Sequence, residues 1–151
     1  MFALIEKFDE TTIEILKKIT FPLSRISLFI IFFWFGFLKI ILASPANPLV
    51  ESLLNKTLPF IGFNQFIIFL GIWEMIIGIT FLIPKAGRIT IALLIPHMIT
   101  TFMPLILLPS LVWQSFLIPT LEGQYIIKNL LIISLAVGIA SRMEPIKRNK
   151  I

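Results

Sequence analysis

Long apolar runs, each bounded by a short group of polar residues, glycines or prolines, dominate this sequence. A helix needs about 20 mostly apolar residues to cross a bilayer. Four stretches meet that length, and we expect them to span the membrane at residues 21–42, 62–83, 88–108 and 124–141. The fold class predicted from this pattern is all-α, an integral membrane four-helix bundle.

The segments outside these spans have their own patterns. Residues 1–20 alternate charged and apolar side chains at helical spacing, which is typical of an amphipathic helix lying at the membrane interface. We expect a second, short interfacial helix within 49–59, and an outer loop at 109–122 that re-enters the membrane or lies at its interface. The predicted organisation is therefore an interfacial segment, a transmembrane domain at 21–142 and a basic tail at 143–151.

Composition agrees with a membrane class, because 58% of the residues are hydrophobic and only 14% are charged. Nine lysines and arginines fall on one side of the predicted spans, and Lys56 alone falls on the other. The nine are Lys7, Lys17, Lys18, Lys85, Arg88, Arg142, Lys147, Arg148 and Lys150. Since positive loops stay inside, we expect a multi-pass protein of the cytoplasmic (inner) membrane with both termini cytoplasmic.

The composition also limits the chemistry and the partners. The chain has no cysteine, which excludes disulfides, thiolate metal sites, iron–sulfur clusters and thiol redox chemistry. The net charge of +5 does not indicate nucleic-acid binding, because the basic residues follow the membrane topology. We expect membrane lipid as a partner, together with a membrane-protein partner or further copies of the chain.

Five ionisable residues lie within or at the edge of the predicted spans, where such side chains are costly and point to function. They are Arg25, Lys39, Glu74, His97 and Lys128. Arg25 and Lys39 share one helix face with Phe32 and Gly36, and this face is expected to point inward. Glu74 lies between Gly71 and Gly78 on a stripe that lets a neighbouring backbone approach closely.

Glu74 needs a cation at this depth, and Arg25, Lys39, Lys128 and a protonated His97 are all candidates. Two interpretations of Glu74 stay open: a carboxylate in a structural ion pair, and a carboxylate with a functional role. Glu74 and His97 together are a candidate proton relay. A single imidazole does not define a metal site, so no metal is predicted, and a packed or hydrogen-bonded histidine is the favoured reading of His97.

Lys39 and Lys128 are expected at a similar depth near the outer interface, where two lysines would attract an anion. Snorkelling to lipid phosphate explains either lysine alone, whereas an inward-facing pair would suit an anionic or quinone-like headgroup. The candidate ligand-binding residues are Arg25, Lys39, Glu74, Lys128, Trp34, Trp73, Gln124 and Tyr125.

Three local signatures resemble the DoxX-like superfamily of small four-helix membrane proteins, in particular its RclC-like branch. They are Arg25 with the string FGFLK at 35–39, the Gly71, Glu74, Gly78 pattern, and the string GQYIIKNL at 123–130. The resemblance implies a four-helix bundle in the cytoplasmic membrane. It also implies a link to quinone oxidoreductases, because DoxD-type relatives are subunits of thiosulfate:quinone oxidoreductases, or to stress responses and membrane-protein assembly.

The leading functional hypothesis is binding of a quinone-like or anionic amphiphile in a polar intramembrane pocket, as a redox- or stress-associated subunit. Quinone is then the expected cofactor, and any enzymatic role would be that of a subunit of a membrane oxidoreductase. The alternative is a non-catalytic assembly or scaffold protein whose buried charges stabilise helix packing. Proton transport ranks third, because four spans enclose only a narrow path.

Overall fold

The computed structural model describes residues 2–145, and four of its helical segments are long and apolar enough to cross a membrane. They are α1 (Phe2–Ile40), α3 (Phe63–Leu82), a segment at Pro84–Leu107 and α7 (Leu121–Ala140). The third segment joins the turn η1 (Pro84–Ala86), α4 (Gly87–Phe102) and α5 (Pro104–Leu107). The four spans predicted from the sequence are confirmed as helices.

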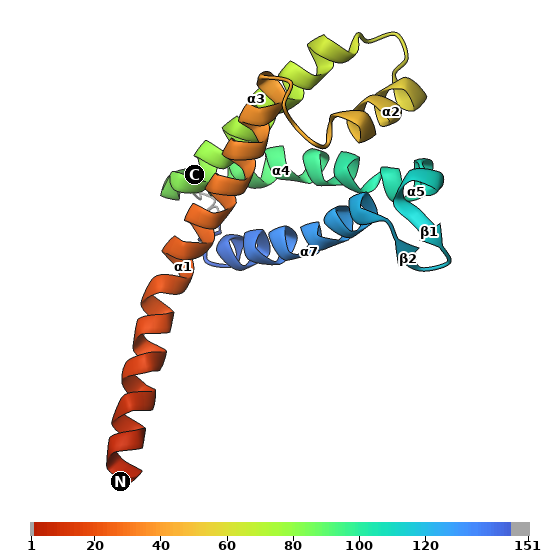
Figure 1. Ribbon diagram of the computed structural model, residues 1–151. Helices are drawn as coiled ribbons and strands as arrows, with labels where there is room; N and C mark the ends of the chain where they lie inside the picture. Colours follow the sequence, from red (N-terminus) through yellow and green to blue (C-terminus); the bar gives the residue numbers. More distant parts are fainter. Residues whose placement is uncertain (1, 146–151) are drawn as a thin grey trace.

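The helix α1 runs without a break across the boundary expected between residues 20 and 21. It has 39 residues and is therefore about 58 Å long, far more than a bilayer core requires. Its N-terminal half projects away from the other helices (Figure 1). Pro22 lies inside the helix, where it removes one backbone hydrogen bond and its ring crowds the carbonyl of Lys18, and the helix continues on both sides of it.

The segment between α1 and α3 contains the expected short helix, α2 (Asn47–Thr57). Pro48 stands in its first turn, where a proline costs no intrahelical hydrogen bond. Figure 1 shows α2 beside the start of α3, at the end of the bundle away from the N-terminus of α1. The ammonium of Lys56 in α2 donates a hydrogen bond of 2.6 Å to the carbonyl of Leu107, which ties α2 to α5.

The expected outer loop contains regular structure. A single helical turn, α6 (Pro109–Val112), leads into a small antiparallel hairpin of β1 (Trp113–Ser115) and β2 (Ile118–Pro119). The indole Nε1 of Trp113 donates to the carbonyl of Leu105 at 3.0 Å, which holds the hairpin against α5. These elements close the end of the bundle where α7 begins (Figure 1).

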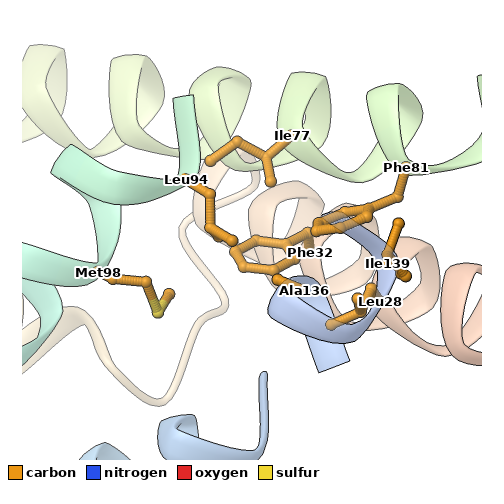
Figure 2. Close-up of a cluster of buried hydrophobic side chains, with 8 residues drawn as sticks. All are labelled: Leu28, Phe32, Ile77, Phe81, Leu94, Met98, Ala136 and Ile139. Atoms are coloured by element: carbon orange, nitrogen blue, oxygen red, sulfur yellow. The ribbon is translucent and has the colours of Figure 1, made fainter. Parts of the chain in front are cut away.

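The core lies where α1, α3, α4 and α7 meet, and α1 makes its most extensive contact with α3. Figure 2 shows eight buried side chains of this core: Leu28, Phe32, Ile77, Phe81, Leu94, Met98, Ala136 and Ile139. All four spans contribute to it, so the bundle has one shared interior. Of the predicted basic tail, residues 146–151 lie outside the described residues.

Candidate functional site: a buried polar cluster

The site begins with a close backbone contact between α1 and α3. A methyl group placed on Gly36 would lie 2.6 Å from the carbonyl oxygen of Gly71, and one placed on Gly71 would lie 2.6 Å from that of Gly36. No larger residue fits either position without displacing a backbone. The expectation that Gly71 lets a neighbouring backbone approach is therefore confirmed, and this contact fixes the register of α1 against α3.

That register places Lys39 directly against Glu74. The Lys39 ammonium lies 2.7 Å from Oε2 of Glu74, and the two side chains are only 7% and 8% exposed. Two charges removed from water in this way are costly unless their geometry and hydrogen bonding are good. Of the four candidate cations for Glu74, the structure brings Lys39 and His97 to the carboxylate, and Lys39 makes the direct hydrogen-bonded ion pair.

His97 on α4 is the third member of the cluster. Its Nε2 lies 3.6 Å from Oε1 of Glu74 and 3.5 Å from Oγ1 of Thr101. The Thr101 hydroxyl already donates its hydrogen to the His97 carbonyl at 2.8 Å, so its oxygen can only accept from the imidazole. Both neighbours of Nε2 are thus acceptors, which favours the tautomer with hydrogen on Nε2.

In that tautomer, Nδ1 of His97 is an acceptor. This atom is buried and has no hydrogen-bond partner within residues 2–145. The imidazole and the Phe32 ring meet in an edge-to-face arrangement, with 5.5 Å between ring centroids. The cluster therefore combines the charged Lys39–Glu74 pair with an unused acceptor, surrounded by the apolar residues of the bundle.

Arg25 lies on the same inward stripe of α1 but is not part of this cluster. It is 14 residues from Lys39, which corresponds to about 21 Å along the helix. Its Nη1 donates to the carbonyl of Phe81 at 2.9 Å, near the C-terminal end of α3. Arg25 and Lys39 therefore serve opposite ends of the α1–α3 contact.

The structure does not bring Lys128 to Lys39. The inward face of α7 carries Gly123 and Ile126, and Lys128 is exposed because two residues turn the helix by about 200° from Ile126. The Lys128 ammonium lies 5.4 Å from the ring centroid of Tyr125, which is itself exposed, as is Gln124. The inward-facing lysine pair expected from the sequence is not formed.

The two tryptophans considered as pocket walls take different positions. Trp34 is 63% exposed and points out of the bundle. Trp73 is half-buried, and its Nε1 donates to the carbonyl of Leu93 at 3.2 Å, joining α3 to α4. Within the described chain no group of three or more His, Cys, Asp or Glu residues could hold a metal ion.

The sequence analysis named Arg25 as a candidate but did not place Arg142 near it. The guanidinium groups of Arg25 and Arg142 both lie over the ring of Phe21, at 4.6 Å and 5.0 Å from its centroid. Phe21 and Arg142 are 121 residues apart, and only the packing of α7 against α1 brings them together. No pattern within a single segment could have indicated this contact.

Comparison of the chain with protein-family models, with curated proteins and with solved structures finds no match.

Proposed function

We propose that this chain is a small multi-pass membrane protein of the DoxX-like type that binds the polar head of a quinone-like or anionic amphiphile at the Lys39–Glu74–His97 cluster. The observation that carries the proposal is the unpartnered Nδ1 of His97, a buried acceptor beside a buried ion pair. Buried polar atoms are almost always hydrogen-bonded in native proteins. A hydrogen-bond donor on a bound ligand would supply the partner that Nδ1 of His97 lacks.

A quinone fits the chemistry of the cluster in both of its oxidation states. A hydroquinone hydroxyl can donate to Nδ1 of His97, and a quinone carbonyl can accept from the Lys39 ammonium, which has hydrogens beyond the one directed at Glu74. Glu74 and His97 are adjacent and could pass a proton between them. The chain has no cysteine, so we assign the electron source to a partner and the redox- or stress-associated subunit role to this protein.

The test is mass spectrometry of the organic extract of the protein purified in mild detergent. We expect the wild type to retain a quinone in stoichiometric amount. His97→Leu should lose it while keeping its helical content and its monodisperse elution, because Leu removes the acceptor and keeps the bulk. Lys128→Ala is the matched control, since Lys128 is exposed on α7, and it should retain the ligand.

Two results would reject ligand binding at this cluster. One is a wild-type protein that is folded but carries no amphiphile. The other is equal retention by the wild type and by His97→Leu, which would place the ligand elsewhere. If Lys128→Ala lost the amphiphile and His97→Leu retained it, the binding site would lie on the exposed face of α7.

The second candidate function is an assembly or scaffold protein, and the backbone contact between Gly36 and Gly71 favours it. The Lys39–Glu74 pair lies at this contact, between the two helices with the most extensive packing. A role in packing predicts that Glu74→Gln lowers thermal stability without changing any bound ligand. Co-purification of one stoichiometric membrane-protein partner would favour this function.

We also propose that the protein lies in the cytoplasmic membrane with both ends of this sequence on the cytoplasmic side. The support is the distribution of basic residues: Lys85 and Arg88 lie at the turn between α3 and α4, whereas Lys56 lies in α2 at the other end of the bundle. We further propose that residues 2–20 rest at the membrane interface, with α1 bending near Pro22 when residues 21–40 span the bilayer. The support is the set of exposed apolar side chains in this segment, among them Leu4, Phe8 and Ile15.

A further inference from the structure

We propose that the end of the bundle around Arg25 and Arg142 is a binding site for the phosphate group of an anionic membrane lipid. The site lies where α3 ends, α4 begins and α7 ends. It is about 21 Å along α1 from the Lys39 cluster, and it does not depend on what that cluster binds.

Arg25 is the inner cation of this site. It lines a small cleft together with Thr80, Thr90 and Met143, so residues from α1, α3, α4 and the segment after α7 contribute to the cleft. Nη1 of Arg25 is used by the carbonyl of Phe81, but Nε is buried and has no partner within residues 2–145. A guanidinium presents five N–H donors, so the Phe81 carbonyl engages only part of the Arg25 group, whose positive charge lies at the inner end of the cleft.

Arg142 is the outer cation, and Phe21 holds it near Arg25. The two guanidinium carbons lie 4.6 Å and 5.0 Å from the centroid of this one ring. The two guanidinium carbons lie at most as far apart as these two lengths combined, an upper limit somewhat above the Debye length of about 8 Å at physiological salt. Like charges at that limit repel each other only weakly, and an anion that contacts both guanidinium groups would be attracted by each of them.

Arg88 adds a third cation at the mouth of the cleft. It follows the cleft residue Gly87, and its Nη2 donates to the backbone carbonyl of Glu144 at 2.6 Å, next to the cleft residue Met143. Among residues 2–145, no carboxylate lies within ion-pair distance of Arg25, Arg88 or Arg142.

The space available indicates where the phosphate lies. The inside of the cleft has a volume of about 10 Å³, enough for one water molecule. The phosphate group of the lipid would therefore lie at the mouth of the cleft, against the exposed Arg142 and Arg88. The acyl chains of the lipid would lie along the apolar faces of the helices. Basic pockets between spans at the cytoplasmic face are a recurrent site for anionic lipid headgroups.

The experiment measures the thermal stability of the full chain in a non-ionic detergent with added phosphatidylglycerol, phosphatidylcholine or sodium phosphate at equal phosphate concentration. We expect phosphatidylglycerol alone to raise the melting temperature. In Arg142→Gln, the concentration of phosphatidylglycerol that gives half of this rise should increase about tenfold or more, because one charge-assisted hydrogen bond is lost. Arg142 is exposed, so this variant should fold normally.

Arg25→Gln should weaken the response less than Arg142→Gln does, because Arg25 acts on the phosphate through its charge and not through a direct hydrogen bond. Arg25→Lys should recover part of this loss by restoring the charge. Lys128→Gln is the matched control, because it also removes one positive charge, but 14 residues from Arg142, near the start of α7, and its response should equal that of the wild type. An equal rise with phosphatidylcholine, or an unchanged response in Arg142→Gln, would reject the site. An equal rise with sodium phosphate would reject a lipid as the source of the phosphate.

Discussion

At the residue scale, the position of Glu74 depends on the two glycines beside it in space. Gly36 and Gly71 bring the backbones of α1 and α3 together, and only then can the Lys39 ammonium reach 2.7 Å from the carboxylate. The sequence showed an inward stripe on each helix but not the register between the stripes. It could therefore name four candidate cations for Glu74 without choosing Lys39.

The close contact predicts a large effect from a small substitution. Gly71→Ala places a methyl group 2.6 Å from the Gly36 carbonyl oxygen, and overpacking of this kind costs about 1–3 kcal/mol. Gly138→Ala is the control, because nothing lies within 4 Å of a methyl group there. It should stabilise α7 by about 0.5–1 kcal/mol, since alanine is the better helix former. Thermal unfolding in detergent compares the two, and an equal change in both would contradict the close contact.

The ion pair predicts non-additive effects. Lys39→Met leaves Glu74 buried without its cation, and Glu74→Gln leaves Lys39 without its anion, so each single change should cost about 3–5 kcal/mol. The double variant leaves no buried charge in the pair and should be clearly more stable than the sum of the single effects implies. A double-mutant cycle on denaturation midpoints measures this. Additive effects would mean that the two side chains do not interact.

At the element scale, the long apolar runs predicted the spans well, but the sequence predicted the segments that connect them poorly. Each span is a long apolar run ended by proline, glycine or charge, and these signals are local. The hairpin of β1 and β2 depends instead on contacts between elements, such as the bond from Trp113 to the Leu105 carbonyl. The continuity of α1 through Pro22 was missed for a different reason: the change from amphipathic to apolar residues at position 20 alters what the helix faces, not whether it is helical.

Thr120 joins the hairpin to α7 and gives a prediction at this scale. Its side chain accepts from the Gly123 amide at 3.2 Å and donates to the Leu111 carbonyl at 2.8 Å. Thr120→Ala removes an N-cap and should cost about 1 kcal/mol. Ser110→Ala, at an exposed position in α6, should change the melting temperature little. The cap would be refuted by equal melting temperatures for the two variants.

At the scale of the whole molecule, the polar residues separate into two groups by depth. The Lys39 cluster lies near the middle of α3 and α4, whereas Arg25 and Arg142 lie at the end where α3 and α7 finish. The inward position of Arg25 could be predicted from the helical spacing on α1. Its contact partners could not, because Phe81 and Arg142 approach it only when all four spans have packed.

The orientation of the bundle in the membrane can be tested with the chain's own lack of cysteine, which makes every introduced cysteine the only reactive thiol. Asn55→Cys in α2 and Gln114→Cys in the hairpin are exposed at one end, and Glu144→Cys is exposed after α7. If basic segments stay inside, a membrane-impermeant maleimide should label the first two in intact cells. Glu144→Cys should react only after the membrane is permeabilised. The opposite labelling pattern would place both ends of the sequence outside, and labelling of Asn55→Cys and Glu144→Cys from the same side would contradict a four-span topology.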